Sequence, residues 1–469
     1  MDTDHSPSPA PSFMMSTSEF CRLAPAIFTA RKAWCCNGIA NRPENGGIDY
    51  RSGANHPSVS LRLVTPDGER LCAGEDFNLH RWPPVPCAKY FDDRAWTAVE
   101  SFAARVVRGE ACVSSLGRDD DLEPAGVCPG RGVNQDGTRI ETLPMYTKGQ
   151  RKRRTNLRVH LAYYGPAFTG WAWTPQHDEE YTSDETVQWA AGERSVTASI
   201  QRALKPLLMD DKERPIYSAG RTDRGVSGAA QCFSVWSNSS HFTGADVNAA
   251  LGNHPAGRTG AWRVVSPVEQ VSTAFHATFC ATWRRYVYVL PMRALDTEDG
   301  APADAPVDVE RTNTMLDALR GKTTDMSAFA RATPPGKDTR CAIKVARAFE
   351  SSIPAADGGE RGGRARRNKK GGSEWDRASG EPGVVSGGGK EEKVLVIELV
   401  ADRFLRKMVR VLVATAVREA ATGAGTDVLL RLAAAGERAA TAPPAPPEGL
   451  IFAGVGYGNH PRWDDRVEG

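Results

Sequence analysis

The sequence contains no long apolar run and almost no excess of charge. No stretch of about 20 consecutive apolar residues occurs, which excludes a hydrophobic transmembrane helix. The formal net charge of the 469 residues is +2, so composition alone does not identify a nucleic-acid partner. Basic residues are nevertheless clustered locally, and local clustering is what determines contact with phosphate.

The cysteines lack the spacings of a metal site or of a disulfide framework. Ten cysteines are scattered along the chain, none of them in a CxxC pair, and Cys35 is followed directly by Cys36. Structural zinc sites usually combine closely spaced pairs of ligands. We therefore expect reduced thiols and no bound metal.

The first third of the chain has little regular patterning. Residues 1–154 show no sustained helical or strand period, and Gly, Pro, Asp and Asn follow one another closely. Within this part, Val59–Val64 could form a short strand and Ala95–Val107 a helix. We interpret residues 1–154 as a poorly ordered N-terminal extension.

Two segments of this extension bear on localisation and leave it open. The stretch MMSTSEFCRLAPAIFTARKAWCC, which begins at Met14, has the Ser, Thr, Ala and basic residues of an organellar transit segment, whereas Asp2 and Asp4 favour a disordered tail. The basic run from Lys148 to Arg154 fits a nuclear signal or an RNA-phosphate contact, but best fits a solvated linker. Chloroplast, mitochondrion, nucleus and cytoplasm are all compatible with these features.

Regular patterning begins near residue 155 and continues to about residue 460. Alternating, aromatic and β-branched residues predict strands at Leu157–Tyr163, Ala230–Trp236, Trp283–Leu290, Cys341–Phe349, Lys393–Val400 and Gly449–Tyr457. Apolar residues at helical spacing predict helices after the cap residue Ser195, at Asp308–Leu319 and at Leu405–Ala421. Because these elements show no regular βαβ repeat, we expect a mixed α+β fold.

One segment inside this region has a different composition. Residues 351–392 are rich in Gly, Arg, Lys, Glu and Ser and have no apolar residues at any regular period. Such a segment cannot bury enough apolar surface to offset the entropy lost on ordering it. Because expected strands flank it, we predict a disordered insertion at the tip of a hairpin, whose basic cluster (Arg361, Arg364, Arg366, Arg367, Lys369, Lys370) is solvated rather than bound to RNA.

The stretch SAGRTDRGVSGAAQCFSVW, residues 218–236, carries the strongest candidate for chemistry. A short expected strand, Pro215–Ala219, leads into a loop bounded by glycines, in which Asp223 lies between Arg221 and Arg224. Glycines permit sharp turns and the close approach of a ligand, and flanking cations favour the ionised carboxylate that a nucleophile or base requires. Taken alone, these residues fit a structural Arg–Asp pair at least as well.

The hexapeptide RTDRGV resembles the R-T-D-x-G-V signature around the catalytic aspartate of the TruA family of pseudouridine synthases. Further segments are similar to other motifs of the family, in the family's order: YYGPAFTGW (163–171), FHATFCATWRRYVYVL (275–290), DMSAFA (325–330), FLRKMVRVLV (404–413) and TAPPAPPEGLIF (441–452). The resemblance spans about residues 157–458. The segments GRTDRGVS, CATWRRYVYV and ATPPGKDTRC resemble the plant and algal branch of the family.

This resemblance implies roles for five residues. Asp223 takes the place of the catalytic aspartate, which either adds to the base or the sugar or removes a sugar proton. Arg221 takes the place of the arginine that fills the gap left by the flipped nucleotide. Tyr286 corresponds to the tyrosine that stacks on the target base, and Leu450 to the leucine beneath the base. A core tyrosine is the alternative for Tyr286, but Tyr286 and Tyr288 share one face of their expected strand, so both could line the same cleft. Arg410 corresponds to the arginine of the M-V-R motif.

The helix expected at Leu405–Ala421 has an apolar side and a cationic side. Arg403, Lys407 and Arg410 follow one another at helical spacing and lie together away from the apolar stripe. This arrangement allows Arg410 to pair with Asp223, whereas a solvated basic face is the better interpretation of the other two.

Four residues depart from the family pattern. Ser227 stands where bacterial members have histidine, Tyr164 replaces an aspartate, Ala172 a glutamine and Met326 a phenylalanine. None of them carries the implied chemistry, so these departures leave open the position of the target uridine rather than the reaction.

The resemblance also implies a fold and a reaction. The expected fold has two similar halves, about 155–270 and 271–460, which join into one extended sheet with helices on one side and a central catalytic cleft. The implied reaction converts uridine to pseudouridine in tRNA, with the anticodon stem-loop region as the expected target. It needs no cofactor, because it involves no redox change and no second substrate. tRNA is the expected partner, other RNA a further option, and the chain could act as a monomer or a homodimer.

Three functions of other classes compete with this one. A catalytically silent RNA-binding protein on the same fold would be expected to lack the acid, but Asp223 is present. A metal-dependent hydrolase would need further Asp, Glu or His ligands at suitable spacing around Asp223, which the sequence lacks. The glycine pairs on either side of Arg361 follow no phosphate-loop pattern, which disfavours a nucleotide-binding protein.

Overall fold

The computed structural model describes residues 80–117, 155–172, 194–208, 215–237, 243–272, 275–295, 305–334, 336–355 and 390–457, together with the short strands β1 (Leu63–Val64) and β2 (Arg70–Leu71). All of these residues belong to one compact unit, residues 61–469. The candidate transit segment, the basic run before residue 155 and the basic cluster near residue 365 lie outside the described residues. Among the described residues, no helix is both long enough and apolar enough to span a membrane.

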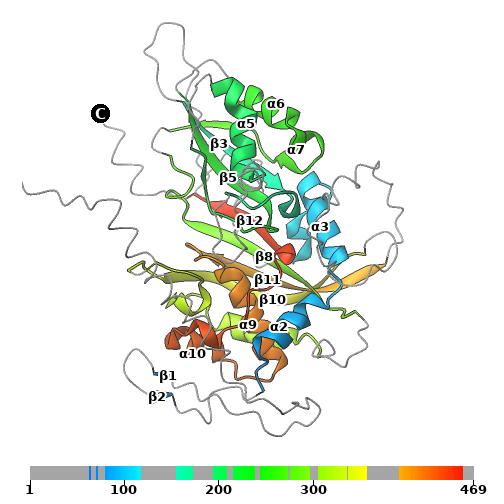
Figure 1. Ribbon diagram of the computed structural model, residues 1–469, viewed down its shortest axis with the longest axis vertical. Coiled ribbons are helices and arrows are strands. Elements are labelled where there is room, and N and C mark those ends of the chain that lie inside the picture. The colour runs from blue at the N-terminus through cyan, green and yellow to red at the C-terminus, as the bar shows by residue number, and fades with distance from the viewer. Residues whose placement is uncertain are drawn as a thin grey trace, which may run out of the picture. The chain divides into compact units, whose positions relative to one another are not determined.

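A ten-stranded mixed sheet forms the centre of this unit (Figure 1). Its order along the main path is β6 (Trp262–Val264), β3 (Thr155–Tyr163), β5 (Ser227–Ser237), β12 (Leu450–Gly456), β8 (Trp283–Pro291), β11 (Glu391–Ala401), β10 (Arg340–Pro354) and β9 (Thr323–Asp325), while β4 (Tyr217–Ser218) pairs with β5 and β7 (Glu269–Val271) with β3. Within this sheet, the β12–β5 pair is parallel and the other pairs are antiparallel. Strand β12, the last one that the structure describes, therefore joins the early strands to the later ones.

Two hydrophobic clusters correspond to the two ends of this sheet. One contains side chains of β3 and β5 with those of α5 (Val196–Leu208) and α6 (Gly244–Asn253), near the short helix α7 (Pro255–Arg258). The other, larger cluster contains side chains of β8, β10 and β11 with those of α8 (Val309–Asp317), α9 (Met408–Ala421) and α10 (Val428–Ala435). Sheet and helices together confirm the α+β class expected from the sequence.

Most of the expected elements are present with shifted ends. Ser195 caps α5, because its Oγ accepts from the backbone N–H of Ala198 at 3.2 Å, and Asp308 caps α8 in the same way. The expected helix at Leu405–Ala421 begins only at Met408, since Lys407 has a left-handed backbone. Helices α6 and α10, of 10 and 8 residues, were not expected from the sequence.

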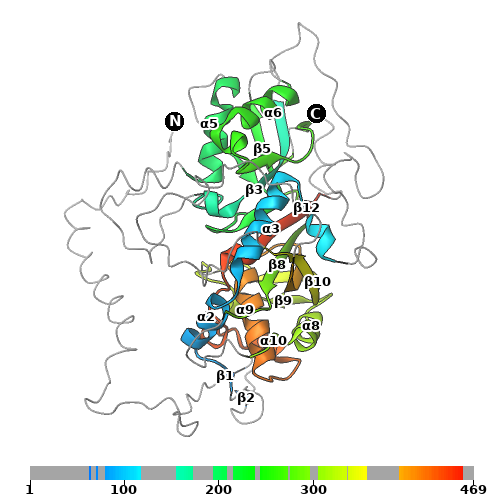
Figure 2. The same ribbon diagram turned by 90° about the vertical axis from the view of Figure 1, so that its right-hand side faces the viewer.

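Helices α2 (Pro84–Asp92) and α3 (Trp96–Arg108) belong to the part of the chain interpreted as a poorly ordered extension, and the structure differs from that interpretation there. Figure 2 shows α3 alongside the sheet, where it contacts β8, β3 and β5. Arg81, just before α2, forms an ion pair of 2.5 Å with the fully buried carboxylate of Glu419 in α9. Residues 80–117 are therefore an integrated part of the core, which the loop-like composition around them obscures.

Strands β10 and β11 form a hairpin at the edge where the insertion is expected. Their pairing continues to Pro354 opposite Glu391, and the N–H of Ala355 donates to the carbonyl of Lys390 at 2.8 Å. Residues 356–389 lie outside the described residues. The strands thus extend a few residues into the segment 351–392 at each end.

Candidate functional site

The loop that carries Asp223 connects β4 to β5. The N–H of Val226 donates to the carbonyl of Asp223 at 3.2 Å, which closes a tight turn, and Gly225 has a φ of +84°, in the region that favours glycine. Thr222 is buried, and its hydroxyl lies 2.6 Å from the hydroxyl of Tyr163 in β3. The loop is therefore held from both ends while Asp223 stays partly exposed.

The opening motif YYGPAFTGW packs directly against this loop. A Cβ at Gly165 would lie 2.4 Å from the carbonyl carbon of Val226 and 2.5 Å from that of Gly225, so no side chain fits there. The backbone N–H of Gly165 donates to the Oγ of Ser227 at 3.0 Å. Ser227, a departure from the bacterial pattern, thus ties the opening motif to the loop.

Arg410, in the first turn of α9, is the cation that meets Asp223. Its Nη1 donates to Oδ2 of Asp223 at 3.2 Å, and the side chains are 12% and 27% exposed. Its Nε donates to the carbonyl of Ala445 at 2.7 Å, and the N–H of Ala445 donates to the carbonyl of Arg410 at 3.0 Å. The pairing predicted from the helix is present, with the guanidinium held on two sides.

The other two basic residues do not share a helix face with Arg410, contrary to the expectation from spacing. Lys407 directly precedes the helix and has a φ of +60°, a left-handed backbone conformation that residues other than glycine rarely adopt. Its side chain is half-buried. Burial lowers the pKa of Lys407, Asp223 raises it, and Arg331, Arg410 and Arg406 lower it. Lys407 therefore lies in the electrostatic environment of Asp223, not on a solvated face.

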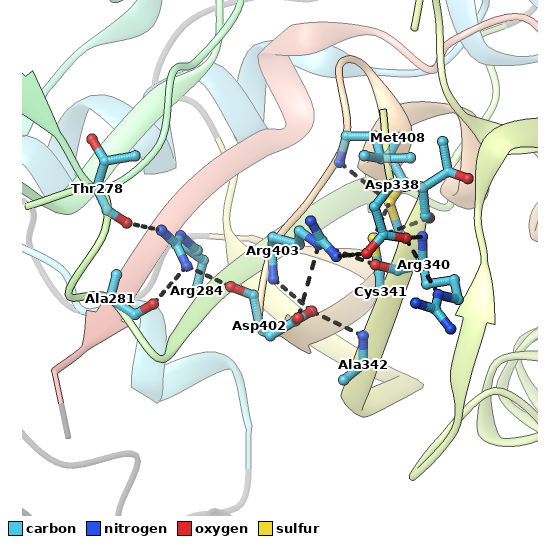
Figure 3. Close-up of polar contacts among 12 residues, drawn as sticks. Thr278, Ala281, Arg284, Asp338, Arg340, Cys341, Ala342, Asp402, Arg403 and Met408 are labelled. Carbon is cyan, nitrogen blue, oxygen red and sulfur yellow. Dashed lines mark hydrogen bonds and ion pairs between the residues drawn. The ribbon is translucent and has the colours of Figure 1, made fainter. Parts of the chain in front are cut away.

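Arg403 points to a separate group of charges. Its Nη2 donates to Oδ2 of Asp338 at 2.8 Å and its Nε to the carbonyl of Arg340 at 3.0 Å, as Figure 3 shows. Both charged side chains of this pair are more than 40% exposed (41% for Arg403 and 49% for Asp338). Arg403 is thus a surface residue outside the Asp223 site.

Tyr286, in β8, lies between two aromatic rings close to the loop. Its ring packs edge-on against Phe404 at 5.1 Å and Phe452 at 5.0 Å between centroids. A Cβ at Gly220 would lie 3.6 Å from the Tyr286 hydroxyl, so this hydroxyl is next to the start of the loop. Burial raises the pKa of Tyr286, and the nearby Tyr163 and Asp223 raise it further, so the hydroxyl stays protonated.

Tyr288 serves the core instead of the site. It is fully buried, its hydroxyl donates to the carbonyl of Pro446 at 3.0 Å, and its ring packs edge-on against Trp96 of α3 at 6.3 Å. The expectation that both tyrosines could line one site is therefore wrong for Tyr288.

The closing segment brings Leu450 to the same region. Pro447 packs on the loop, since a Cβ at Gly225 would lie 2.9 Å from its Cγ. Leu450 follows at the start of β12, buried and in register with Tyr288. Gly449, between Pro447 and Leu450, has no room for a side chain, because a Cβ would lie 2.7 Å from the carbonyl oxygen of Val289.

Arg221, the fifth predicted site residue, is exposed on the loop, as is Arg224.

Arg284 is a buried residue next to the site that the sequence analysis missed. Its Nη1 donates to the carbonyls of Ala281 (2.9 Å) and Asp402, and its Nη2 to that of Thr278 at 2.6 Å (Figure 3). Its Nε donates to the carbonyl of Ala219 at 3.0 Å. Ala219 leads into the Asp223 loop, and Asp402 precedes the turn into α9. One guanidinium therefore connects the two segments that supply Asp223 and Arg410. Its position two residues before Tyr286 was the available signal.

The described residues contain no group of three or more His, Cys, Asp or Glu side chains arranged to hold a metal ion. The polar groups around Asp223 are cations, hydroxyls and backbone amides instead. Such a set can orient a carboxylate by hydrogen bonds and bind phosphate.

Comparison with known proteins finds several relatives that share one name. The chain is 28% identical over 319 residues (66% of this chain, 92% of the relative) to a protein of Corynebacterium glutamicum named tRNA pseudouridine synthase A. It is 26% identical over 309 residues (66% and 99%) to a protein of the same name from Chlorobaculum tepidum, and 26% identical over 301 residues (63% and 93%) to one from Xanthomonas oryzae pv. oryzae. These relatives support the assignment of the chain to the TruA family. No family model matches it. The TruA match covers nearly the full length of these relatives and about two thirds of this chain.

Proposed function

We propose that this TruA-family chain is an enzyme that isomerises uridine to pseudouridine in tRNA, with Asp223 as its catalytic carboxylate. The name shared by its relatives supports the reaction and the substrate. The observation that carries the assignment of the acid is the hydrogen-bonded pair of Asp223 and Arg410, at 3.2 Å. Two sequence motifs that are far apart in the chain, RTDRGV and MVR, supply its two members.

The reaction exchanges one bond to the sugar for another. The bond between N1 of uracil and C1′ of ribose breaks, the base turns, C5 bonds to C1′, and the C5 proton is released to solvent while N1 gains one. Asp223 acts at the sugar or the base in the first step. Arg410 orients its carboxylate through the hydrogen bond from Nη1 to Oδ2.

The remaining predicted residues bind the substrate in this proposal. The protonated hydroxyl and ring of Tyr286, beside the start of the loop, contact the target base, and Leu450 packs beneath it. Arg221, exposed on the loop, occupies the place of the flipped nucleotide and can bond phosphate. The proposed target lies in the anticodon stem-loop region.

A catalytically silent RNA-binding protein is the second candidate. It keeps the cationic surroundings of the site but makes no use of an ionised acid beside a buried tyrosine. The partly exposed Asp223, held by a guanidinium that is itself fixed to Ala445, favours the enzyme.

The test is tritium release from tRNA transcripts labelled at C5 of uridine, followed by mapping of the modified position. We expect release by the purified full chain, at one or a few uridines of the anticodon stem-loop region. Tight tRNA binding without release would favour the silent protein, and release from another region would leave the reaction but overturn the proposed target.

A further inference from the structure

Phe279 is an unusually exposed aromatic side chain close to the site. Among the described residues, Val85 and Phe279 are the exposed large hydrophobic side chains, and Phe279 is 63% exposed. A single exposed apolar residue is common on protein surfaces. What distinguishes Phe279 is the ring stack behind it.

Three rings follow one another at stacking distance. Tyr217 of β4 lies 4.3 Å from His276, and His276 lies 4.4 Å from Phe279, with interplanar angles of 44° and 33°. The Nδ1 of His276 accepts from the backbone N–H of Thr278 at 3.2 Å and of Phe279 at 3.4 Å. These bonds require an unprotonated Nδ1, and burial lowers the pKa of His276, which keeps the imidazole neutral.

Hydrogen bonds connect the segment that carries these rings to the backbone that leads into the Asp223 loop. The hydroxyl of Thr278 donates to the carbonyl of Ser218 at 2.5 Å, and the carbonyl of Thr278 accepts from Nη2 of Arg284 at 2.6 Å. Arg284 also holds Ala219, so the segment 276–279 and the start of the loop share one buried anchor, as Figure 3 shows for its Thr278 side. Phe279 therefore has a fixed position relative to Asp223, and it projects to solvent on a rigid support.

We propose that Tyr217, His276 and Phe279 form a platform on which an unpaired base of the RNA substrate stacks, with Phe279 as the ring that meets the base. This inference rests on the proposed function for the identity of the substrate. Every base has an aromatic face, so stacking of this kind binds single-stranded positions without reading their sequence. The exposed cations Arg221 and Arg224 on the neighbouring loop supply charge for the phosphates that flank such a base.

The test compares three substitutions at Phe279 in the full chain carrying Asp223→Asn, so that binding is measured without turnover. Phe279→Ala removes the ring, Phe279→Leu keeps apolar bulk without an aromatic face, and Phe279→Trp enlarges the face. We expect Ala and Leu to weaken the affinity for a tRNA transcript about 5- to 150-fold, and Trp to bind at least as tightly as Phe. Val85→Ala, at the other exposed apolar residue, is the matched control and should bind unchanged.

A second measurement separates this inference from the proposed function. An RNA stem-loop offers unpaired bases, and a blunt duplex of the same stem offers none. Phe279→Ala should reduce affinity for the stem-loop and leave affinity for the duplex unchanged, whether or not the wild-type chain forms pseudouridine. The platform is overturned if Phe279→Leu binds the stem-loop like the wild type, or if Phe279→Ala weakens both RNAs equally.

Discussion

Nη1 of Arg410 lies 3.2 Å from Oδ2 of Asp223, although the two residues are 187 positions apart in the chain. Asp223 comes from a loop between two strands of the early half of the sheet, and Arg410 from the first turn of α9 in the later half. Their meeting joins the two halves of the fold at one ion pair.

Replacement of Arg410 should affect the reaction more than the fold. Arg410→Met removes the hydrogen-bond donor that orients the Asp223 carboxylate, so the single-turnover rate should fall about 100-fold. Arg403→Met, which removes the contacts with Asp338 and with the carbonyl of Arg340 outside the site, is the control and should keep the wild-type rate. Equal single-turnover rates for the two variants would show that Arg410 is only part of a basic surface.

The close contact of Gly165 with the loop predicts that any side chain there displaces Asp223. Gly165→Ala should lower kcat strongly and destabilise the fold, because its Cβ would meet the backbone of Gly225 and Val226 within 2.5 Å. Gly252→Ala in α6 has open space around it and should stabilise the protein by up to about 1 kcal/mol with unchanged activity. Normal activity in Gly165→Ala would show that the loop is not held as described.

Arg284 should behave as a positioning residue. Arg284→Lys has too few donors in the right geometry for the carbonyls of Ala219, Thr278, Ala281 and Asp402, and each buried carbonyl left unpaired costs about 1–3 kcal/mol. Urea unfolding should show a loss of several kcal/mol. At a temperature where the variant is folded, kcat should still fall while KM changes little, whereas a purely structural role would leave kcat intact.

Helix α3 should be required for the stability of the whole unit. Trp96 is 4% exposed, and its Nε1 donates to the carbonyl of Phe91 at 2.7 Å. Trp96→Ala should reduce the free energy of unfolding by about 3–5 kcal/mol, measured by urea denaturation. A change below about 1 kcal/mol would mean that this segment is dispensable, as the extension interpretation holds.

Sequence patterns predicted what depends on local periodicity and on short motifs. The aromatic and β-branched residues of WRRYVYVL predict β8, and the spacing in the segment after Phe404 predicts an apolar helix with Arg410 on its other side. Both elements are found, although β8 is buried along nearly its whole length and α9 is buried on almost every side apart from Arg410.

Features that depend on tertiary contacts were not predictable in this way. The left-handed backbone of Lys407 shifts the start of α9 and moves Lys407 toward Asp223, which helical spacing cannot indicate. The bonds of Arg284 go to carbonyls of four separate positions, and backbone acceptors carry no side-chain signature. The roles of Asp223, Tyr286, Arg221, Arg410 and Leu450 stay predictions until their variants are measured.

The most direct test of the account is pseudouridine formation by Asp223→Asn. The amide keeps the size of the side chain and removes its charge, so we expect tRNA affinity close to that of the wild type and no detectable tritium release from C5-labelled tRNA. Asp317→Asn, at the last residue of α8, alters an exposed ion pair with Arg320 and is the matched control, which should react like the wild type. Substantial turnover by Asp223→Asn, with the control equally active, would contradict the claim that Asp223 is the catalytic carboxylate.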